Sequence, residues 1–303
     1  MNIYDLIILG AGPAGITAAV YSARKKMDFL IISKDLGGQA AWSGDIENYT
    51  GYQFISGTEL VSKFRQHIEH FGVEYRMPEE AKMISRQENL IHLKTDKSEY
   101  ISKSIIVATG KHPRPLGVKG EKEFKNRGVT YCATCDGPLF KGKEVVVAGG
   151  GNSAIDAALS MSRMSPKVYI VNLEPQLRGD NLTVETVKSL SNVEIINSSE
   201  ITEIYGDKFV KGVKIKKDGE VIDLSVKGIF VEIGLIPNSS FIDMVGKNEL
   251  GEIKVDCHNR TSVEGVFSAG DVTNVPEKQI IVACGEGSKA SLSSFKYINS
   301  RKF

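Results

Sequence analysis

Two segments of the chain share one pattern of apolar and small residues. Residues 5–25 and residues 144–163 each contain an apolar run, a glycine-rich turn and an alanine-rich stretch, in that order. Another apolar run follows each segment, at residues 29–33 and 168–171. Short apolar runs are typical of buried strands, and alanine favours helices. The pattern therefore predicts a strand–helix–strand unit twice, about 140 residues apart, which suits two domains.

Further apolar runs and two alternating stretches predict the remaining strands. The apolar runs lie at residues 104–108, 228–232 and 265–269. Polar and apolar residues alternate over residues 84–97 and 200–226, which predicts antiparallel strands beside each parallel sheet. Prolines at 111–115 and 235–238 mark the places where we expect the chain to cross between domains.

Composition and charge change this picture little. The chain has 303 residues, of which 41% are hydrophobic and 25% charged, and its formal net charge is +1. Such a balance favours neither a nucleic-acid nor a membrane partner. The uncharged stretch from Leu6 to Ala23 lacks a basic leader and is interrupted by glycines, so it indicates a strand, a turn and a helix rather than a signal segment. The expected location is the cytoplasm.

Both glycine turns have a spacing that suits a dinucleotide. In a Gly-x-Gly-x-x-Gly turn the first glycine permits a tight bend, the second lets the backbone approach a pyrophosphate, and the third lets helix and strand pack closely. Gly10, Gly12 and Gly15 occupy these positions in the first turn. The second turn has glycines at 149 and 151 and Ala154 in the third place. A turn that only packs a helix on a strand is the alternative for either segment.

The four cysteines indicate redox chemistry at one place. Cys132 and Cys135 form a Cys-x-x-Cys pair, a spacing at which a disulfide can open and close without large backbone movement. A zinc site built from this pair with Cys257 and His258 is an alternative, as are two inert buried thiols, but no second Cys-x-x-Cys is present. Cys257 and Cys284 are expected to be structural. No metal is expected.

Several short motifs, taken in order, carry a resemblance to a known family. They are Gly37-Gly38-Gln39, Ile46-Glu47-Asn48-Tyr49, Ala108-Thr109-Gly110, Cys132-Ala-Thr-Cys135-Asp136-Gly137 and Ala269-Gly270-Asp271. With them the chain resembles the low-molecular-weight thioredoxin reductases and the flavoprotein part of alkyl hydroperoxide reductase. The resemblance implies an α/β fold of two Rossmann-like, doubly wound, three-layer domains, the second inserted into the first. The FAD domain would comprise residues 1–113 and 240–303, and the inserted pyridine-nucleotide-type domain residues 114–239.

The resemblance also implies roles for individual residues. Cys135 would lie next to the flavin, Cys132 would attack the disulfide of a partner protein, and Asp136 would move protons between the pair and the substrate thiols. The residues implied for FAD are Gly10, Gly12, Gly15, Gly38, Gln39, Asn48, Thr109, Gly110, Gly270, Asp271 and Gln279. Those implied for NADH, if it is the donor, are Gly149, Gly151 and Ala154. A homodimer is also implied.

The electron donor is where the sequence departs from the family pattern. Members that use NADPH carry His-Arg-Arg-x-x-x-Arg after the second strand of the inserted domain, and these cations hold the 2′-phosphate. Here only Arg178 matches, Asn172 takes the first position, and Glu174 would repel a phosphate. NADPH is therefore disfavoured. NADH and reduced ferredoxin both remain open, and the basic stretches that could face an acidic ferredoxin lie at 119–122, 125–127 and 141–143.

The sequence thus predicts an enzyme, a flavoprotein disulfide oxidoreductase of the thioredoxin reductase type. Electrons would pass through FAD to the Cys132/Cys135 disulfide and on to thioredoxin or a similar small redoxin. Two alternatives are a reductase of a peroxiredoxin system and a flavin-binding redox regulator without turnover.

Overall fold

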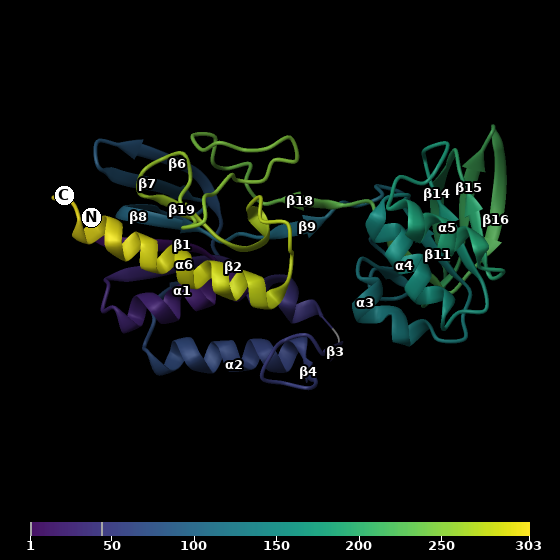
Figure 1. The fold of residues 1–303 in the computed structure, drawn as a ribbon, viewed down its shortest axis with the longest axis horizontal. Helices are drawn as coiled ribbons and strands as arrows, with labels where there is room; N and C mark the ends of the chain where they lie inside the picture. The colour runs from purple at the N-terminus through teal and green to yellow at the C-terminus, as the bar shows by residue number, and fades with distance from the viewer. Residues whose placement is uncertain (1, 44) are drawn as a thin grey trace. The chain divides into compact units, whose positions relative to one another are not determined.

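The chain forms two compact units, shown in Figure 1. Unit 1 comprises Met1–His112 and Ile236–Phe303, and unit 2 comprises Pro113–Leu235. The computed structural model describes residues 2–43 and 45–303, with all of their side chains except those of Trp42, Asp45, Thr134 and Cys135. Where the chain passes between the units, β9 (Lys111–Pro113) pairs with β18 (Leu235–Pro237).

Unit 1 is built on a sheet whose strand order is β5-β2-β1-β8-β7-β6, with β19 also pairing with β8. The strands are β1 (Ile3–Ala11), β2 (Phe29–Leu36), β5 (Tyr75–Arg76), β6 (Ala81–Gln87), β7 (Leu90–Thr95), β8 (Glu99–Val107) and β19 (Val266–Ser268). β1 pairs in parallel with β2 on one side and β8 on the other. Residues Leu6 to Leu9 are buried on both faces of the sheet, which explains their unbroken apolar run.

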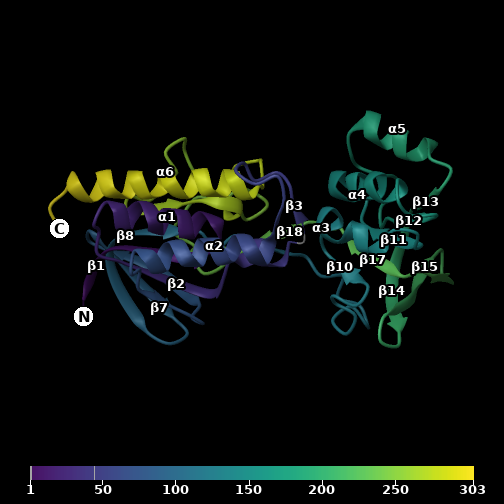
Figure 2. The same cartoon turned by 90° about the horizontal axis from the view of Figure 1, so that it is seen from below.

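Three helices cover one face of this sheet. They are α1 (Pro13–Arg24), α2 (Gly57–His70) and α6 (Ile280–Asn299), and Figures 1 and 2 show α1 between the other two. Leu6 and Ile8 of β1 pack toward these helices, while Ile7 and Leu9 pack into a second cluster on the opposite face. The remaining short elements of unit 1 are the 3-10 helices η1 (Gly38–Trp42) and η3 (Gly270–Val272) and the antiparallel pair β3 (Asp45–Ile46) and β4 (Ile55–Ser56).

Unit 2 repeats the arrangement with a parallel sheet in the order β10-β17-β11-β12-β13. Its strands are β10 (Val129–Thr130), β11 (Val145–Ala148), β12 (Val168–Val171), β13 (Val193–Ile196) and β17 (Gly228–Val231). Its helices are α3 (Ala133–Asp136), η2 (Gly137–Phe140), α4 (Asn152–Ser162) and α5 (Asn181–Ser189). An antiparallel sheet of β14 (Ser199–Gly206), β15 (Val210–Lys217) and β16 (Glu220–Ser225) completes the unit.

The layers of unit 2 follow from where its apolar residues pack. Val145 and Val147 of β11 face a core shared with α4 and α5, whereas Val146 and Ala148 face a core shared with Val213 and other residues of the antiparallel sheet. The parallel sheet therefore lies between helices on one side and antiparallel strands on the other, in three layers.

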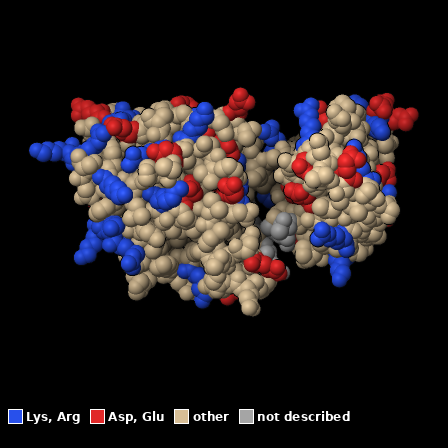
Figure 3. Space-filling view, in the orientation of Figure 1, with Lys and Arg blue, Asp and Glu red and all other residues tan. Residues whose placement is uncertain are grey.

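The predicted α/β class and both strand–helix–strand units are confirmed. Residues 84–97 and 200–226 form antiparallel strands as the alternation predicted. The first pair extends the main sheet through β7 and β8, and the second stretch makes a sheet of its own. Positive and negative side chains are interspersed on the face seen in Figure 3. None of the described helices combines the length and hydropathy that a membrane crossing would need.

Candidate active site

The first glycine turn joins β1 to α1 at the carboxyl end of the sheet. Gly10 has φ 101°, and a Cβ there would lie 2.3 Å from the carbonyl oxygen of Ala108. A Cβ on Gly15 would lie 1.8 Å from the carbonyl oxygen of Gly10, so helix and strand approach closely here. Gly12 is the N-cap of α1 and Pro13 its first residue. The turn lies between β1 and β8, where the strand order reverses and open α/β sheets bind ligands.

The second glycine-rich turn of unit 1 packs directly against the first. The backbone N–H of Gly37 donates to the carbonyl of Ala11 at 2.7 Å, and a Cβ on Gly38 would lie 3.6 Å from the Cα of Gly12. Gly37 and Gly38 have φ values of 91° and 55°. A side chain on Gly38 would crowd the N-cap of α1, so this glycine keeps that helix end open, whereas a Cβ on Gly37 would lie 2.5 Å from the side chain of Val61 in α2.

The other residues predicted for FAD lie in four separate segments of unit 1. Asn48 donates from Nδ2 to Oε1 of Gln279 at 3.0 Å, which joins two segments 231 residues apart. The hydroxyl of Thr109 donates to the carbonyl of Asn238 at 2.6 Å, and Gly110 has φ 64°. Gln39 lies in η1, directly after Gly38.

Asp271 reaches the first glycine turn from the other end of the chain. It lies in η3 after β19, and a Cβ on Gly270 would be 3.0 Å from the Cβ of Ala14 in α1. Burial raises the pKa of the Asp271 carboxyl, and the nearby ammonium groups of Lys278 and Lys111 offset only part of this effect. The carboxylate is therefore held in a protected place beside α1.

A buried cluster of charges adjoins Asp271, and sequence reasoning missed it. The ammonium of Lys111 lies 2.5 Å from Oε1 of Glu252, and both side chains are only 8% exposed. Lys278 lies 3.2 Å from the same oxygen, and Asn248 donates to Oε2 at 2.6 Å. Burial pushes the pKa of Glu252 upward, but the hydrogen bonds from Lys111, Asn248 and Lys278 outweigh it and the pKa is lowered.

The redox turn of unit 2 comprises residues 130–136. Cys132 is disulfide-bonded and directly precedes α3. The side chain of Cys135 lies outside the described residues, although its backbone belongs to α3. The buried hydroxyl of Thr130 accepts the backbone N–H of Cys132 at 3.2 Å and donates a short hydrogen bond to Oδ2 of Asp136. Thr130 thus connects the predicted proton-carrying residue to the redox cysteine.

Glu232 contacts the same turn from the end of β17. Its Oε1 accepts the backbone N–H of Ala133 at 3.3 Å. Burial raises the pKa of the Glu232 carboxyl to about 7, and the Ala133 N–H opposes part of that rise. No sequence motif marked Glu232, because 99 residues separate it from Ala133.

The glycine turn of unit 2 lies against Glu232. Gly149 has φ 135°, and a Cβ there would lie 2.3 Å from the carbonyl oxygen of Glu232 and 3.1 Å from the Cβ of the buried Ala154. Gly151 is the N-cap of α4. β11 is flanked by β12 and β17, so this turn and Glu232 occupy the point where the strand order of unit 2 reverses.

The segment after β12 occupies the position at which NADPH-dependent members of the family bind the 2′-phosphate. Asn172 is buried, and its Nδ2 donates to the carbonyl of Glu174 and to Oδ1 of Asn197, both at 3.0 Å. The guanidinium of Arg178 lies 2.8 Å from the carboxylate of Glu174 on the surface. The matching cation is therefore already paired with an acid.

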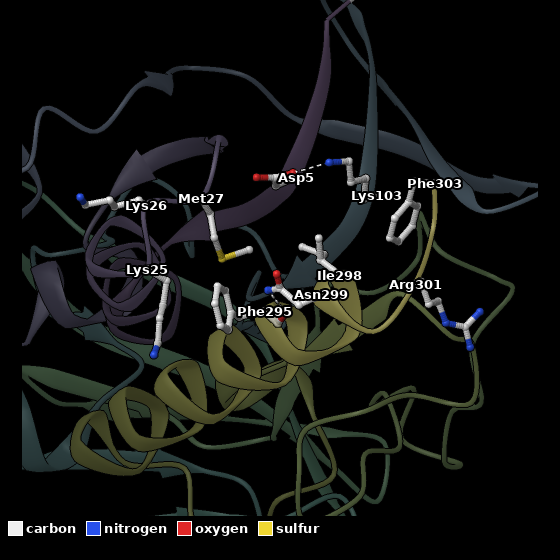
Figure 4. A pocket seen from close by; sticks show the side chains of 10 residues that line it. All are labelled: Asp5, Lys25, Lys26, Met27, Lys103, Phe295, Ile298, Asn299, Arg301 and Phe303. Atoms are coloured by element: carbon white, nitrogen blue, oxygen red, sulfur yellow. Dashed lines mark hydrogen bonds and ion pairs between the residues drawn. The ribbon is translucent and has the colours of Figure 1, made fainter.

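The two remaining cysteines and a surface hollow carry no chemistry of this kind. Cys257 is free and exposed. Cys284 is free and buried in α6, and burial raises the pKa of its thiol. A hollow of ≈ 520 Å³ lies near the start of β1, at the opposite end of this strand from Gly10 (Figure 4). Lys103 there is paired with Asp5 at 2.6 Å.

Comparison with known proteins agrees with this geometry. The model of the family "pyridine nucleotide-disulphide oxidoreductase" matches residues 4–287. The chain belongs to this family. The members of this family are FAD-binding disulfide oxidoreductases. In this oxidoreductase, the two glycine turns and the redox turn are the parts that suit such chemistry.

Individual relatives of this oxidoreductase are similar over nearly its whole length. A thioredoxin reductase from Streptococcus pyogenes MGAS5005 is 36% identical, with 99% of each chain covered and a TM-score of 0.83. An alkyl hydroperoxide reductase polypeptide of Escherichia coli is 40% identical over 97% of this chain. A protein named NADH dehydrogenase from Ferdinandcohnia aciditolerans is 38% identical over 97% of this chain. The chain spans 57% and 58% of the length of the Ferdinandcohnia and Escherichia relatives respectively.

Proposed function

We propose that this protein is a flavin-dependent reductase of thioredoxin or a similar small redoxin, with Cys132 and Cys135 as its redox pair. The observation that carries the proposal is the redox turn, in which a disulfide-bonded cysteine is linked through Thr130 to Asp136. The turn belongs to the same unit as the second glycine turn, in a chain of an FAD-binding family.

The residues of unit 1 fit FAD. The turn at Gly10 and Gly12, with Gly38 against it, leaves room at the N-terminus of α1 for a pyrophosphate, because the helix end offers N–H groups and a positive partial charge. Asp271 would accept hydrogen bonds from cofactor hydroxyls, and Asn48 and Gln279 would hold the segments around it. FAD, when bound, supplies the two-electron carrier between the donor and the disulfide.

The chain's own residues would then carry out the thiol attack and the proton transfer. Cys132 would attack the disulfide of the partner protein, and Asp136 would pass the proton that the resolving thiol needs. Thr130 would keep Asp136 directed toward the pair, since its hydroxyl binds both Asp136 and the Cys132 backbone. Leu139, 69% exposed and three residues after Asp136, offers an apolar contact for a small redoxin.

NADH is our proposed donor. The polar atoms of Asn172 are engaged within the protein, which leaves the exposed carboxylate of Glu174 as the group for ribose hydroxyls. The same carboxylate, paired with Arg178, disfavours the 2′-phosphate of NADPH. Ferredoxin is the competing donor. Its support is weaker, because the exposed Lys119 of the first basic stretch is already paired with Glu203 at 2.6 Å.

The test is anaerobic bleaching of the bound flavin followed by reduction of thioredoxin. We expect NADH to bleach the flavin and NADPH to do so far more slowly; bleaching by reduced ferredoxin alone would reassign the donor. We expect Cys132→Ser to be bleached normally but to reduce thioredoxin at less than about a hundredth of the wild-type rate, because the attacking thiolate is gone.

The outcome that would refute the proposal is thioredoxin reduction at the wild-type rate by the Cys132→Ser variant. The matched control is Cys257→Ser, which removes a free, exposed thiol and should leave the rate unchanged. If the wild type reduces only a peroxiredoxin-type partner, the peroxiredoxin system becomes its substrate class. A flavin that binds but never reduces any dithiol protein would favour the regulator.

A further inference from the structure

Among the described acids of unit 2, Glu232 is the one whose pKa burial raises, and the proposed chemistry leaves it unused. Its backbone is fixed on the nucleotide side, since its N–H donates to the carbonyl of Ala148 at 2.8 Å and its own carbonyl abuts Gly149. Its side chain binds the N–H of Ala133. The residue therefore connects the end of β11 with the redox turn.

The contact with Ala133 places a carboxyl group next to the redox cysteine. Cys132 and Ala133 are consecutive, and their backbone N–H groups are bound by Thr130 and Glu232 respectively. A negative charge on Glu232 would oppose a thiolate on Cys132, whereas a neutral carboxyl would not. The effect of one group on the other is reciprocal, so a thiolate on Cys132 would favour protonation of Glu232 by the same amount.

The elements that pack around Glu232 contain few other charged groups that could influence thiolate formation at Cys132. On the redox turn the titratable residues are Tyr131, Cys132, Cys135 and Asp136, of which Tyr131 donates its hydroxyl to Glu121 at 2.8 Å. The ends of β11 and β17 contribute only apolar residues and glycine. The charged residues of α4 and its C-cap, Asp156 and Arg163, are exposed to solvent. The surroundings of Glu232 are thus apolar apart from the redox turn, in keeping with burial as the main cause of its raised pKa.

We propose that Glu232 is a positioning residue of the redox site, which tunes thiolate formation at Cys132 and takes up a proton when the disulfide is reduced. This inference rests on the proposed function for the identity of the redox pair. A two-electron donor, reduced flavin in the enzyme or a dithiol in solution, breaks the S–S bond and leaves both electrons on the sulfurs. Of the two protons that the donor releases, one neutralises Glu232 and one protonates a sulfur, so that a single thiolate remains.

The test measures how fast Cys132 is alkylated by iodoacetamide as a function of pH, with each peptide quantified by mass spectrometry. A Cys135→Ser background leaves Cys132 unable to form its disulfide, and the exposed thiol of Cys257 in the same molecule is an internal reference. Glu232→Gln keeps an acceptor for the Ala133 N–H but removes the charge. Turnover and flavin are not needed, so this result is independent of whether the donor or redoxin assignment holds.

We expect equal alkylation of Cys132 in both forms near about pH 6, where Glu232 is neutral. Near about pH 8 the Glu232→Gln form should react about three- to tenfold faster, because tenfold corresponds to one unit of thiol pKa. The Cys257 rates should agree throughout, and Glu194→Gln, a change at an exposed acid of β13, should behave like the parent.

A ratio that is the same at every pH, or equal rates at all pH values, would overturn the proposal. If Glu232→Gln does not fold, the pH profile of Cys132 alkylation in the parent protein tests the proposal by itself. With a coupled carboxyl its Cys132 profile has two inflections, and a profile with a single thiol inflection would equally overturn the proposal.

Discussion

At the scale of single residues, the hydroxyl of Thr130 is expected to have a large effect on the rate of thioredoxin reduction. Its hydroxyl satisfies the backbone N–H of Cys132 and binds the carboxylate of Asp136. Replacing it with valine keeps the volume and the β-branch but leaves two half-buried polar groups, the Cys132 N–H and the Asp136 carboxylate, without their partner. We therefore expect Thr130→Val to lower the rate of thioredoxin reduction about tenfold or more, which is part of the roughly 10²- to 10⁴-fold contribution of a positioned general acid.

The measurement is the rate of redoxin reduction with the flavin already reduced, together with the free energy of unfolding. The free energy of unfolding should fall by about 1–3 kcal/mol in Thr130→Val, the penalty for an unsatisfied buried group. Thr130→Ser retains the hydroxyl and is the matched control, which should keep most of the rate. A valine variant as fast as the serine variant would show that Asp136 needs no such support.

At the scale of elements, buried charges join β9 to the loop after β18 and to the segment before α6. Lys111 lies on β9, Glu252 on the loop that follows β18, and Lys278 just before α6. Removing one partner of a buried pair leaves the other charge uncompensated, at a typical cost of about 3–5 kcal/mol. We therefore expect Glu252→Gln to lower the free energy of unfolding by about that amount at neutral pH.

The stability difference between wild type and Glu252→Gln is expected to depend on pH in one direction. The pKa of Glu252 is lowered in the folded protein, so its contribution is present above the pKa of the unfolded chain and is lost as pH falls through the folded value. The difference between wild type and Glu252→Gln, measured by urea unfolding, should shrink below about pH 4. Glu99→Gln, which removes an exposed partner 3.9 Å from Lys94, should change stability by less than about 1 kcal/mol. If Glu252→Gln also lowered the free energy of unfolding by less than about 1 kcal/mol at neutral pH, the prediction would be contradicted.

How far the sequence predicts the fold and the site depends on the range of each interaction. The turns at Gly10 and Gly149 are local, and their strands, helices and carboxyl-end location follow from residues within one segment. The Lys111–Glu252 pair and the Glu232–Ala133 contact join residues 141 and 99 positions apart. Neither has a spacing or periodicity in the sequence, because the pairing of β10 with β17 brings Ala133 near Glu232, and the path of the loop after β18 brings Glu252 near Lys111. Charged residues also look alike in sequence whether they are buried or solvated.

At the scale of the whole molecule, the candidate chemistry divides between the two units. Every residue predicted for FAD belongs to unit 1, and the redox turn, Glu232 and the second glycine turn belong to unit 2. The relatives from Escherichia coli and Ferdinandcohnia aciditolerans are longer than this chain, so what they do with additional segments is not transferred to it. What the division does predict is that each cofactor stabilises a different unit.

Amide hydrogen exchange tests this division directly. A ligand that binds only the folded state stabilises it by about 2.7 kcal/mol at a hundred times its dissociation constant. FAD added to protein stripped of flavin should therefore slow exchange in Met1–His112 and Ile236–Phe303, most of all around Gly10 and Gly38, and leave most amides of Pro113–Leu235 unaffected. NADH should instead slow exchange around Gly149 at the start of α4. Protection by FAD concentrated in Pro113–Leu235 would mean that the flavin binds at the second glycine turn, and the assignment of Asp271 would fall with it.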